Sequence, residues 1–315
     1  MRYRLDLAYD GTDFFGWATQ PGRRTVQDTL ETWITQVLRL GEPARLVVAG
    51  RTDAGVHATG QVCHLDVPDD HEVRLRSGTG DLATVLDHRL RRVLPDDLVV
   101  RGVRPVPDDF DARFSATFRR YTYRLWDEQS EREPTLRRRV AQVRGVLDLS
   151  AMNEAGDLLL GLHDFAAFCK PREGATTIRT LRQLQGVRTE DGTVEFTVVA
   201  DAFCHSMVRS LMGTLVAVGQ ADADRPGRVP RDLAWVADLL GRPRRDSSVL
   251  VMPAGGLTLS EVGYPAEDQF AARSSEARNR RGPILSGPNV SDPNASGPND
   301  SDPNVSDPEQ SEANA

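Results

Sequence analysis

The chain has 315 residues, a formal net charge of -7 at pH 7 and 39% hydrophobic residues. A chain of this length can bury a substantial apolar core without disulfide or metal staples. It contains no run of about 20 apolar residues, which a membrane span requires, and it begins with an alternating pattern rather than a secretory signal. We therefore expect a cytoplasmic protein that does not cross a membrane.

The negative charge is concentrated at the C-terminal end. Residues 286–315 contain six acids and no bases, so they account for -6 of the formal charge of -7. The unit S-[G/D]-P-[N/E]-x occurs there five times in succession, and such a polar, proline-rich repeat cannot bury enough apolar surface to fold. We expect a disordered acidic tail over residues 274–315. The rest of the chain is nearly neutral, and its arginine clusters can still bind a polyanion.

The first part of the chain predicts the element order β-α-β-β-α-β. Residues 3–9 alternate apolar and polar side chains, as a half-buried strand does. Thr25 and Asp28 form a helix-capping pair, and an apolar stripe at helical spacing follows them. The expected strands are 3–9, 45–49, 61–67 and 98–105, and the expected helices are 26–40 and 81–93.

The second part predicts the same order with one helix inserted. A strand with alternating tyrosines opens it, and the turn-forming Asp191-Gly192 step separates two further strands. The expected strands are 121–125, 181–188, 194–200 and 257–262, and the expected helices are 149–160, 205–218 and 231–240.

Two such series indicate an α+β protein built from two ferredoxin-like β-α-β-β-α-β halves. We expect an N-terminal half over residues 1–110 and a C-terminal half over residues 111–270. Joined edge to edge, their strands would form an extended, mainly antiparallel sheet with a central active-site cleft.

The segment 49–60, A-G-R-T-D-A-G-V-H-A-T-G, lies between two expected strands and holds three glycines. Such a backbone is tightly bent and exposed. Asp53 at its centre is suited to act as a nucleophile or base, whereas an ordinary turn aspartate only caps local amides. The spacing alone leaves both interpretations open.

A second feature is Arg209, the only charged residue in the apolar helical stretch 206–221. Burying a guanidinium without a partner is costly, so Arg209 should emerge at the helix end or meet a carboxylate. We expect Asp53 to be that carboxylate and to be held ionised and oriented by the pair. The alternative is a salt bridge that serves only packing.

The third feature is Arg119-Arg120-Tyr121-Thr122-Tyr123. Aromatic side chains on one strand face beside arginines on the other are typical of sites that stack RNA bases and hold phosphates. Alternating tyrosines also occur in ordinary sheets. Tyr121, Arg119 and Arg120 are therefore candidate substrate-binding residues.

The cysteines, Cys63, Cys169 and Cys204, are odd in number and widely spaced. This pattern favours neither a disulfide framework nor a zinc site, although a histidine follows Cys63 and another follows Cys204. We interpret all three as small core residues and expect no metal.

Together these segments resemble the TruA-type tRNA pseudouridine synthases. The motifs occur in the family's order over residues 3–265: Tyr9-Asp10-Gly11 with Gly16-Trp17, A-G-R-T-D-A-G-V-H-A, R-R-Y-T-Y, M-V-R-S-L-M-G and P-A-G-G-L-T-L-S-E-V-G-Y-P. The resemblance implies that Asp53 is the catalytic aspartate, that Tyr121 lies against the uracil ring and that Arg209 pairs with Asp53. It also implies that Arg51 helps to expel the target base from the stack.

The resemblance further implies isomerisation of uridine to pseudouridine at positions 38, 39 and 40 of tRNA, by a homodimer that needs no cofactor and no metal. Two positions depart from the family pattern. Ala18 stands where glutamine is frequent, and Arg91 stands where asparagine is usual. Both concern the expected RNA contacts rather than the chemistry.

Several mechanisms and two rival functions stay open at this point. Asp53 could add to the uracil ring, attack the sugar carbon or remove the 2′ proton, and Tyr121 could take the carbon-5 proton or position a water that does. A non-catalytic RNA-binding protein would not need Asp53, Tyr121 and Arg209 together. A hydrolase would need a second carboxylate or a metal cluster beside Asp53, and the sequence indicates neither.

Overall fold

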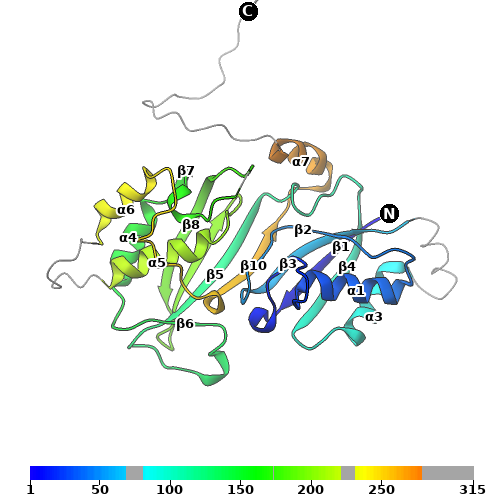
Figure 1. Ribbon diagram of the computed structural model, residues 1–315, viewed down its shortest axis with the longest axis horizontal. Coiled ribbons are helices and arrows are strands. Elements are labelled where there is room, and N and C mark those ends of the chain that lie inside the picture. Colours follow the sequence, from blue (N-terminus) through cyan, green and yellow to red (C-terminus); the bar gives the residue numbers. More distant parts are fainter. Residues whose placement is uncertain (69–80, 173, 221–230, 279–315) are drawn as a thin grey trace, which may run out of the picture. The chain divides into compact units, whose positions relative to one another are not determined.

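The computed structural model describes residues 1–68, 81–172, 174–220 and 231–278. Its main feature is a sheet of ten strands in the order β4-β1-β3-β10-β5-β9-β8-β7, with β2 also paired to β3 and β6 to β5. Among the described strand pairs, β3–β10 and β5–β6 are parallel and the others are antiparallel. Helices α1 and α3 lie near one end of the sheet and α4, α5 and α6 near the other (Figure 1).

The first part of the chain follows the predicted order. Its elements are β1 (Arg2–Tyr9), α1 (Val26–Leu38), β2 (Leu46–Val48), β3 (His57–Asp66), α3 (Leu82–Val93) and β4 (Leu98–Val106). The hydroxyl of Thr25 accepts a hydrogen bond from the backbone N–H of Asp28 at 3.3 Å, which confirms the predicted N-cap of α1. In space the strands follow the order β4-β1-β3-β2.

The second part repeats this arrangement. Its main elements are β5 (Phe118–Trp126), α4 (Leu149–Asp157), β8 (Ile178–Arg188), β9 (Val194–Ala200), α5 (Met207–Gly219), α6 (Leu233–Leu240) and β10 (Leu257–Gly263). The strand order β10-β5-β9-β8 has the same pattern as β4-β1-β3-β2. Two described strands and one described α-helix were not predicted: β6 (Ala141–Gln142), β7 (Gly161–Asp164) and α7 (Phe270–Arg278).

One edge of β3 is shared by two strands, and this sharing joins the two parts. The C-terminal end of β3 pairs with β2, through residues such as Cys63 and Leu65. Its N-terminal end pairs with β10, where His57 lies opposite Thr258 and Ala58 lies opposite Leu259. The loop from β2 to β3 therefore begins and ends at the point where β2 and β10 diverge.

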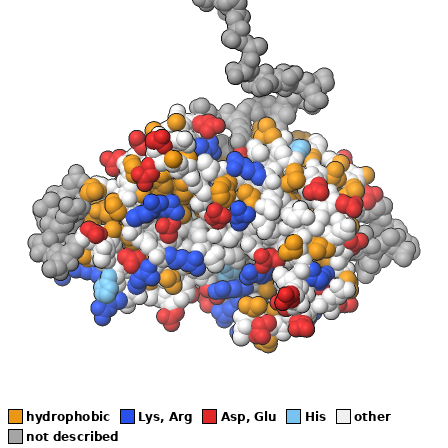
Figure 2. All heavy atoms as spheres, turned by 180° about the vertical axis from the view of Figure 1, so that it is seen from behind, with side chains coloured by type: hydrophobic (Ala, Val, Ile, Leu, Met, Phe, Trp, Pro, Cys, Tyr) orange, Lys and Arg blue, Asp and Glu red, His pale blue; other side chains and the backbone are white. Residues whose placement is uncertain are grey.

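The sheet has one buried face and one face that is partly open. In β1 the side chains of Tyr3, Leu5, Leu7 and Tyr9 are buried and alternate with half-exposed residues, three of which are charged. On the partly open face, β5 carries Arg120, which pairs with Glu261 at 2.9 Å, and Arg124, which pairs with Glu195 at 2.7 Å. Figure 2, which views the molecule from behind Figure 1, shows basic and acidic side chains interspersed on that side.

The predicted fold class is confirmed, with two local differences. Strand β3 begins at His57 rather than at Gln61, because residues 57 and 58 pair with β10, a long-range contact that local patterning does not reveal. The boundary expected at Ser274 falls inside α7, where Ser274 is buried, so residues 274–278 are helical. The remainder of the expected tail lies outside the described residues, and the division of the body at residue 110 stays a prediction. Among the described helices, none is long and apolar enough to cross a membrane.

Candidate active site

The loop between β2 and β3 carries Asp53, and several hydrogen bonds hold it against the sheet. The side-chain amide of Gln61 donates to the carbonyl of Gly50 at 2.9 Å. The hydroxyls of Tyr9 and Thr52 lie 2.8 Å apart in the core. Gly55 has φ +78°, a conformation that favours glycine and turns the chain back into β3. Asp53 is therefore presented from an anchored loop rather than from a loose one.

A second loop, residues 11–17, packs directly on the Asp53 loop. The N–H of Trp17 donates to the carbonyl of Thr52 at 3.0 Å, and the N–H of Gly55 donates to the carbonyl of Phe14 at 3.3 Å. A Cβ at Gly16 would lie 2.8 Å from the Thr52 carbonyl oxygen, so only glycine allows this approach. The Gly16-Trp17 motif thus supports the conformation of the Asp53 loop.

The two carboxylate oxygens of Asp53 face different cationic or ionisable side chains. Oδ2 lies 3.7 Å from Nη1 of Arg209, which confirms the predicted pairing, and Oδ1 lies 3.4 Å from Nε2 of His205. The side chain of Asp53 is 29% exposed, so a substrate can reach it. Arg209 is positioned in turn by a hydrogen bond from its Nε to the carbonyl of Met252 at 2.6 Å.

Tyr121 lies on the buried side of β5, close to the same carboxylate. Its ring is 7% exposed and meets the ring of Phe203 edge to face, with centroids 5.1 Å apart. Burial is the main cause that raises the pKa of Tyr121 well above the ordinary phenol value, and the neighbouring Tyr9 and Asp53 add to it. The hydroxyl of Tyr121 therefore stays protonated throughout the neutral pH range.

The structure corrects the substrate-binding role expected for Arg119. This residue is 8% exposed, and its guanidinium donates to three backbone carbonyls: those of Asp201 at 2.7 Å, Ala49 at 2.8 Å and Arg113 at 2.7 Å. A guanidinium so occupied cannot also hold an RNA phosphate. Instead it ties together three segments, two of which lead to Asp53 and to His205. Alternation along β5 places Arg119 on the same buried face as Tyr121, but the three carbonyls that bind its guanidinium come from separate segments and could not be read from the strand itself.

The other two predicted arginines are partly or fully exposed. Arg120 is half-exposed on the opposite side of β5 from Tyr121, where it pairs with Glu261, so the structure does not bring it to Asp53. Arg51 lies on the Asp53 loop and is exposed. Burial, and after it the positive charges of Arg51 and Arg172, lower the pKa of Arg113. Arg51 and Arg172 are therefore close enough to Arg113 for their positive charges to act on it.

The expectation of three unpaired cysteines is wrong. Cys169 and Cys204 form a disulfide with their Cα atoms 5.8 Å apart, while Cys63 is free and buried. Thirty-five positions separate the two in the sequence, so their spacing gave no indication of contact. The bond links the segment after Phe168 to the residue that precedes His205. Within the described residues, no cluster of His, Cys, Asp and Glu could hold a metal.

His205 is the site residue that sequence reasoning missed as a partner of Asp53. It precedes α5, four positions before Arg209, and in the sequence it stands out only because it follows Cys204. The four-residue spacing to Arg209 gave no reliable indication, because Ser206 has φ +65° and His205 therefore does not continue the helical repeat of α5. His205 and Arg209 both reach Asp53 from the beginning of α5.

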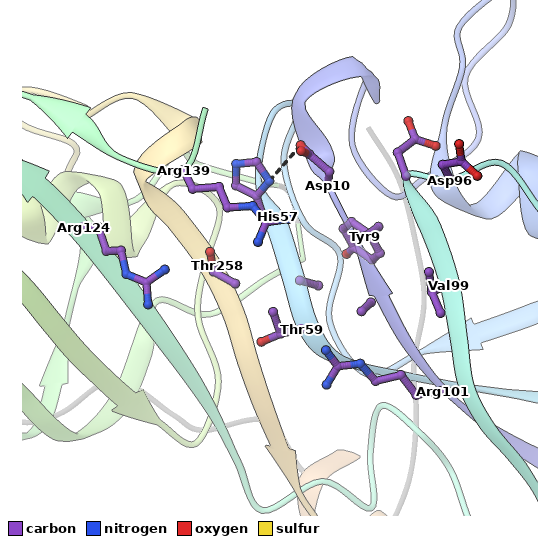
Figure 3. Close-up of a pocket in the computed structure, with 13 residues that line it drawn as sticks. Tyr9, Asp10, His57, Thr59, Asp96, Val99, Arg101, Arg124, Arg139 and Thr258 are labelled. Atoms are coloured by element: carbon purple, nitrogen blue, oxygen red, sulfur yellow. Dashed lines mark ion pairs between the residues drawn. The ribbon is translucent and has the colours of Figure 1, made fainter. Parts of the chain in front are cut away.

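A cavity of about 190 Å³ opens elsewhere on the sheet. In Figure 3, Arg101, Arg124 and Arg139 surround it, and His57 contacts Asp10 at 3.1 Å. Nε2 of His57 lies 2.9 Å from the carbonyl of Arg138, and burial lowers the pKa of His57, so the neutral imidazole donates to that carbonyl. Asp53, Tyr121 and Arg209 do not line this cavity.

The family model and the sequence relatives that match this chain show a pseudouridine synthase, an isomerase that converts uridine to pseudouridine. The model of a family described as tRNA pseudouridine synthase matches residues 7–115 and 155–265. The chain therefore belongs to the tRNA pseudouridine synthase family.

Three relatives illustrate the match, and each is named tRNA pseudouridine synthase A. The protein from Cutibacterium acnes is 58% identical over 282 residues, which cover 89% of this chain and 95% of the relative. The protein from Streptomyces avermitilis is 50% identical, covering 89% and 94%, and that from Bifidobacterium longum is 44% identical, covering 88% and 98%. A solved Cbf5-Nop10-Gar1 complex gives a TM-score of 0.32 at 9% identity, covering 84% of this chain and 60% of that chain, and we infer nothing from it.

Proposed function

We propose that this chain isomerises uridine to pseudouridine in tRNA, at positions 38, 39 and 40 of the anticodon arm. The observation that carries the proposal is the Asp53 carboxylate, which is 29% exposed and faces Arg209 and His205. The names of the relatives support tRNA as the substrate. The resemblance of the five sequence motifs supports the three positions.

Asp53 is the proposed catalytic carboxylate. Pseudouridine formation breaks the N-glycosidic bond, turns the uracil and joins carbon 5 to the sugar, so it involves no net redox change and no incoming group. Each of the three possible roles of Asp53 requires its carboxylate in contact with the flipped nucleotide. Arg209 and His205 hold that carboxylate in one orientation before the substrate arrives. We propose that the reaction needs neither a cofactor nor a metal.

Tyr121 is proposed to lie against the uracil ring and to position the water that removes the carbon-5 proton. Direct removal by Tyr121 would require its phenolate, which the raised pKa disfavours at neutral pH. Arg51 is proposed to assist expulsion of the base, because it is exposed and stands two residues before Asp53.

The oligomeric state and location belong to the same proposal. We propose a cytoplasmic homodimer in which one tRNA contacts both subunits, and the family resemblance is the support for it. Light scattering of the purified protein, alone and with tRNA, tests the dimer. A mass that corresponds to one subunit per tRNA would contradict it.

The deciding experiment measures pseudouridine in an unmodified tRNA transcript after incubation with the wild type or with Asp53→Ala, without added metal or nucleotide. We expect product at positions 38, 39 and 40 with the wild type and none with Asp53→Ala. Binding of tRNA by both proteins without product in either would favour the RNA-binding alternative. Product at other uridines would support the pseudouridine synthase activity and contradict the proposed positions.

A further inference from the structure

Phe15 is the most exposed aromatic side chain of the protein. Its exposed fraction is 45%, whereas the other phenylalanines, the tyrosines and the tryptophans, all of which are described, are buried or half-buried. Single exposed apolar residues are common on protein surfaces and need no explanation by themselves. The position of Phe15 beside the Asp53 loop is what requires one.

The residues on both sides of Phe15 bind the Asp53 loop. Phe14 accepts a hydrogen bond from Gly55 at 3.3 Å, and Trp17 donates to Thr52 at 3.0 Å. Phe14 and Trp17 are buried, so they anchor this loop in the core while Phe15 points out of it. An exposed ring is thus held beside the loop that carries the Asp53 carboxylate.

The backbone of Phe15 is held on both sides as well. Its N–H donates to the carbonyl of Arg24 at 2.9 Å, and its carbonyl accepts from the side-chain amide of Gln20 at 2.8 Å. The ring itself has one charged neighbour, because the guanidinium carbon of Arg23 lies 4.3 Å from the ring centroid. In the part of the chain that the structure describes, no carboxylate pairs with Arg23.

We propose that Phe15 and Arg23 form a binding subsite for a nucleotide that neighbours the target uridine in the RNA. The base of that nucleotide stacks on the Phe15 ring, and Arg23 contacts its phosphate. Single-stranded RNA is recognised in this way, since every base offers a face to an aromatic ring and every phosphate offers a charge to an arginine. The subsite rests on the proposed function and adds to it residues that hold the strand after the target base has left the stack.

A role in packing alone predicts different behaviour. If Phe15 only covered Arg23 or the loop, tryptophan at this position would disturb the packing and any loss of binding would accompany a loss of stability. A stacking residue should instead tolerate tryptophan, which offers a larger ring, and should affect RNA affinity without lowering the melting temperature.

The test measures the Kd for an unmodified tRNA transcript in an Asp53→Ala background, which prevents turnover, at fixed salt. We expect Phe15→Ala to raise Kd about five-fold or more, and Phe15→Trp to keep it near the parent value. Arg23→Gln should make the slope of log K against log salt concentration shallower by about one unit, as expected for the loss of one phosphate contact. The matched control is Val187→Ala on β8, at a side chain that is 56% exposed, and it should leave Kd unchanged.

An unchanged Kd for Phe15→Ala would overturn the subsite, and so would a Phe15→Trp variant that binds as weakly as Phe15→Ala at equal melting temperature. The proposed function is tested separately, by product formation with the wild-type Asp53 on the same transcript. A wild type that makes no pseudouridine but loses affinity with Phe15→Ala would reject the function and keep the RNA subsite.

Discussion

Asp53 and Arg209 face each other across the junction of the two parts of the sheet, with Oδ2 of the carboxylate 3.7 Å from Nη1 of the guanidinium. Asp53 comes from the loop that enters β3, and Arg209 comes from α5. Because Nε of Arg209 also donates to the carbonyl of Met252, the guanidinium is held in place beside the Asp53 carboxylate. The site therefore exists only when the two parts are joined.

Arg209→Gln should lower kcat at least about ten-fold, which corresponds to roughly 1.4 kcal/mol of lost transition-state stabilisation. The amide cannot supply the positive charge opposite Oδ2 of Asp53. Arg209→Lys should rescue only part of this loss, because one ammonium cannot replace the fork that reaches both Met252 and Asp53. Steady-state kinetics on a tRNA transcript measure both variants.

Arg120→Gln is the matched control, since Arg120 pairs with Glu261 on the other side of β5. Its kcat should equal that of the wild type. Equal kcat values for Arg209→Gln and the wild type would show that the Asp53–Arg209 pair serves packing alone.

Much of this fold follows from local sequence patterns. The stripe of α1 and the alternation of β1 each bury one face, and the resulting element order leads to two ferredoxin-like halves. The start of β3 at His57 depends on pairing with β10, and such a contact between distant segments leaves no periodic trace. The same reason applies to the disulfide of Cys169 and Cys204.

The candidate site also has some features that the sequence predicts and others that it does not. A lone arginine in an apolar helix predicted a carboxylate partner, because an unpaired buried charge is costly, and Asp53 is that partner. Strand alternation places Arg119 on the same face of β5 as Tyr121, but the three carbonyls that occupy its guanidinium come from different segments and leave no local pattern. His205 approaches Asp53 for a comparable reason, since the end of β9 and the start of α5 determine its position.

Tyr121→Phe should preserve tRNA binding and reduce the yield of pseudouridine, because the ring remains while the hydroxyl that positions the water is lost. The pH dependence of the activity that this variant retains should have the same shape as that of the wild type up to about pH 10, the ordinary phenol range. The raised pKa of Tyr121 keeps the hydroxyl protonated over this range, so its ionisation cannot shape the profile. Pre-steady-state turnover from pH 7 to pH 10 measures this.

A wild-type profile that rises with a phenol-like titration absent from Tyr121→Phe would assign the proton transfer to the phenolate. Full turnover by Tyr121→Phe would remove the hydroxyl from the mechanism altogether.

Arg119→Met should destabilise the protein by about 3 kcal/mol or more, because each buried carbonyl left without a donor costs about 1–3 kcal/mol. Three carbonyls, those of Ala49, Arg113 and Asp201, lose their shared donor. Arg119→Lys keeps the charge but can donate to fewer of these carbonyls, so its free energy of unfolding should lie between those of the wild type and Arg119→Met. Urea denaturation measures the differences. Stability of Arg119→Met equal to that of the wild type would mean that water replaces the guanidinium.

Asp127 should make the free energy of unfolding depend on pH in the acidic range. Its side chain is buried, and burial alone would raise its pKa, but hydrogen bonds from Arg188 and from the N–H groups of Leu147 and Gln129 lower the pKa from 3.8 to about 2. A lowered folded-state pKa stabilises the protein above the unfolded-state value and loses this effect as the pH falls through the folded-state value. The contribution is about 2 kcal/mol at neutral pH and declines between about pH 5 and pH 2.

Asp127→Asn should therefore lower the free energy of unfolding at pH 7, since it leaves the Arg188 guanidinium without its carboxylate. The difference from the wild type should shrink as the pH falls from about 5 to about 2, because the wild type then loses the same charge. Urea denaturation at several pH values measures both effects. Asp191→Asn is the control: its half-exposed carboxyl at the neighbouring turn accepts hydrogen bonds from Thr189 and Thr193 rather than from an arginine, so it should change the acid dependence less. A difference for Asp127→Asn that stays constant down to pH 2 would show that the ionised pair does not supply the stabilisation.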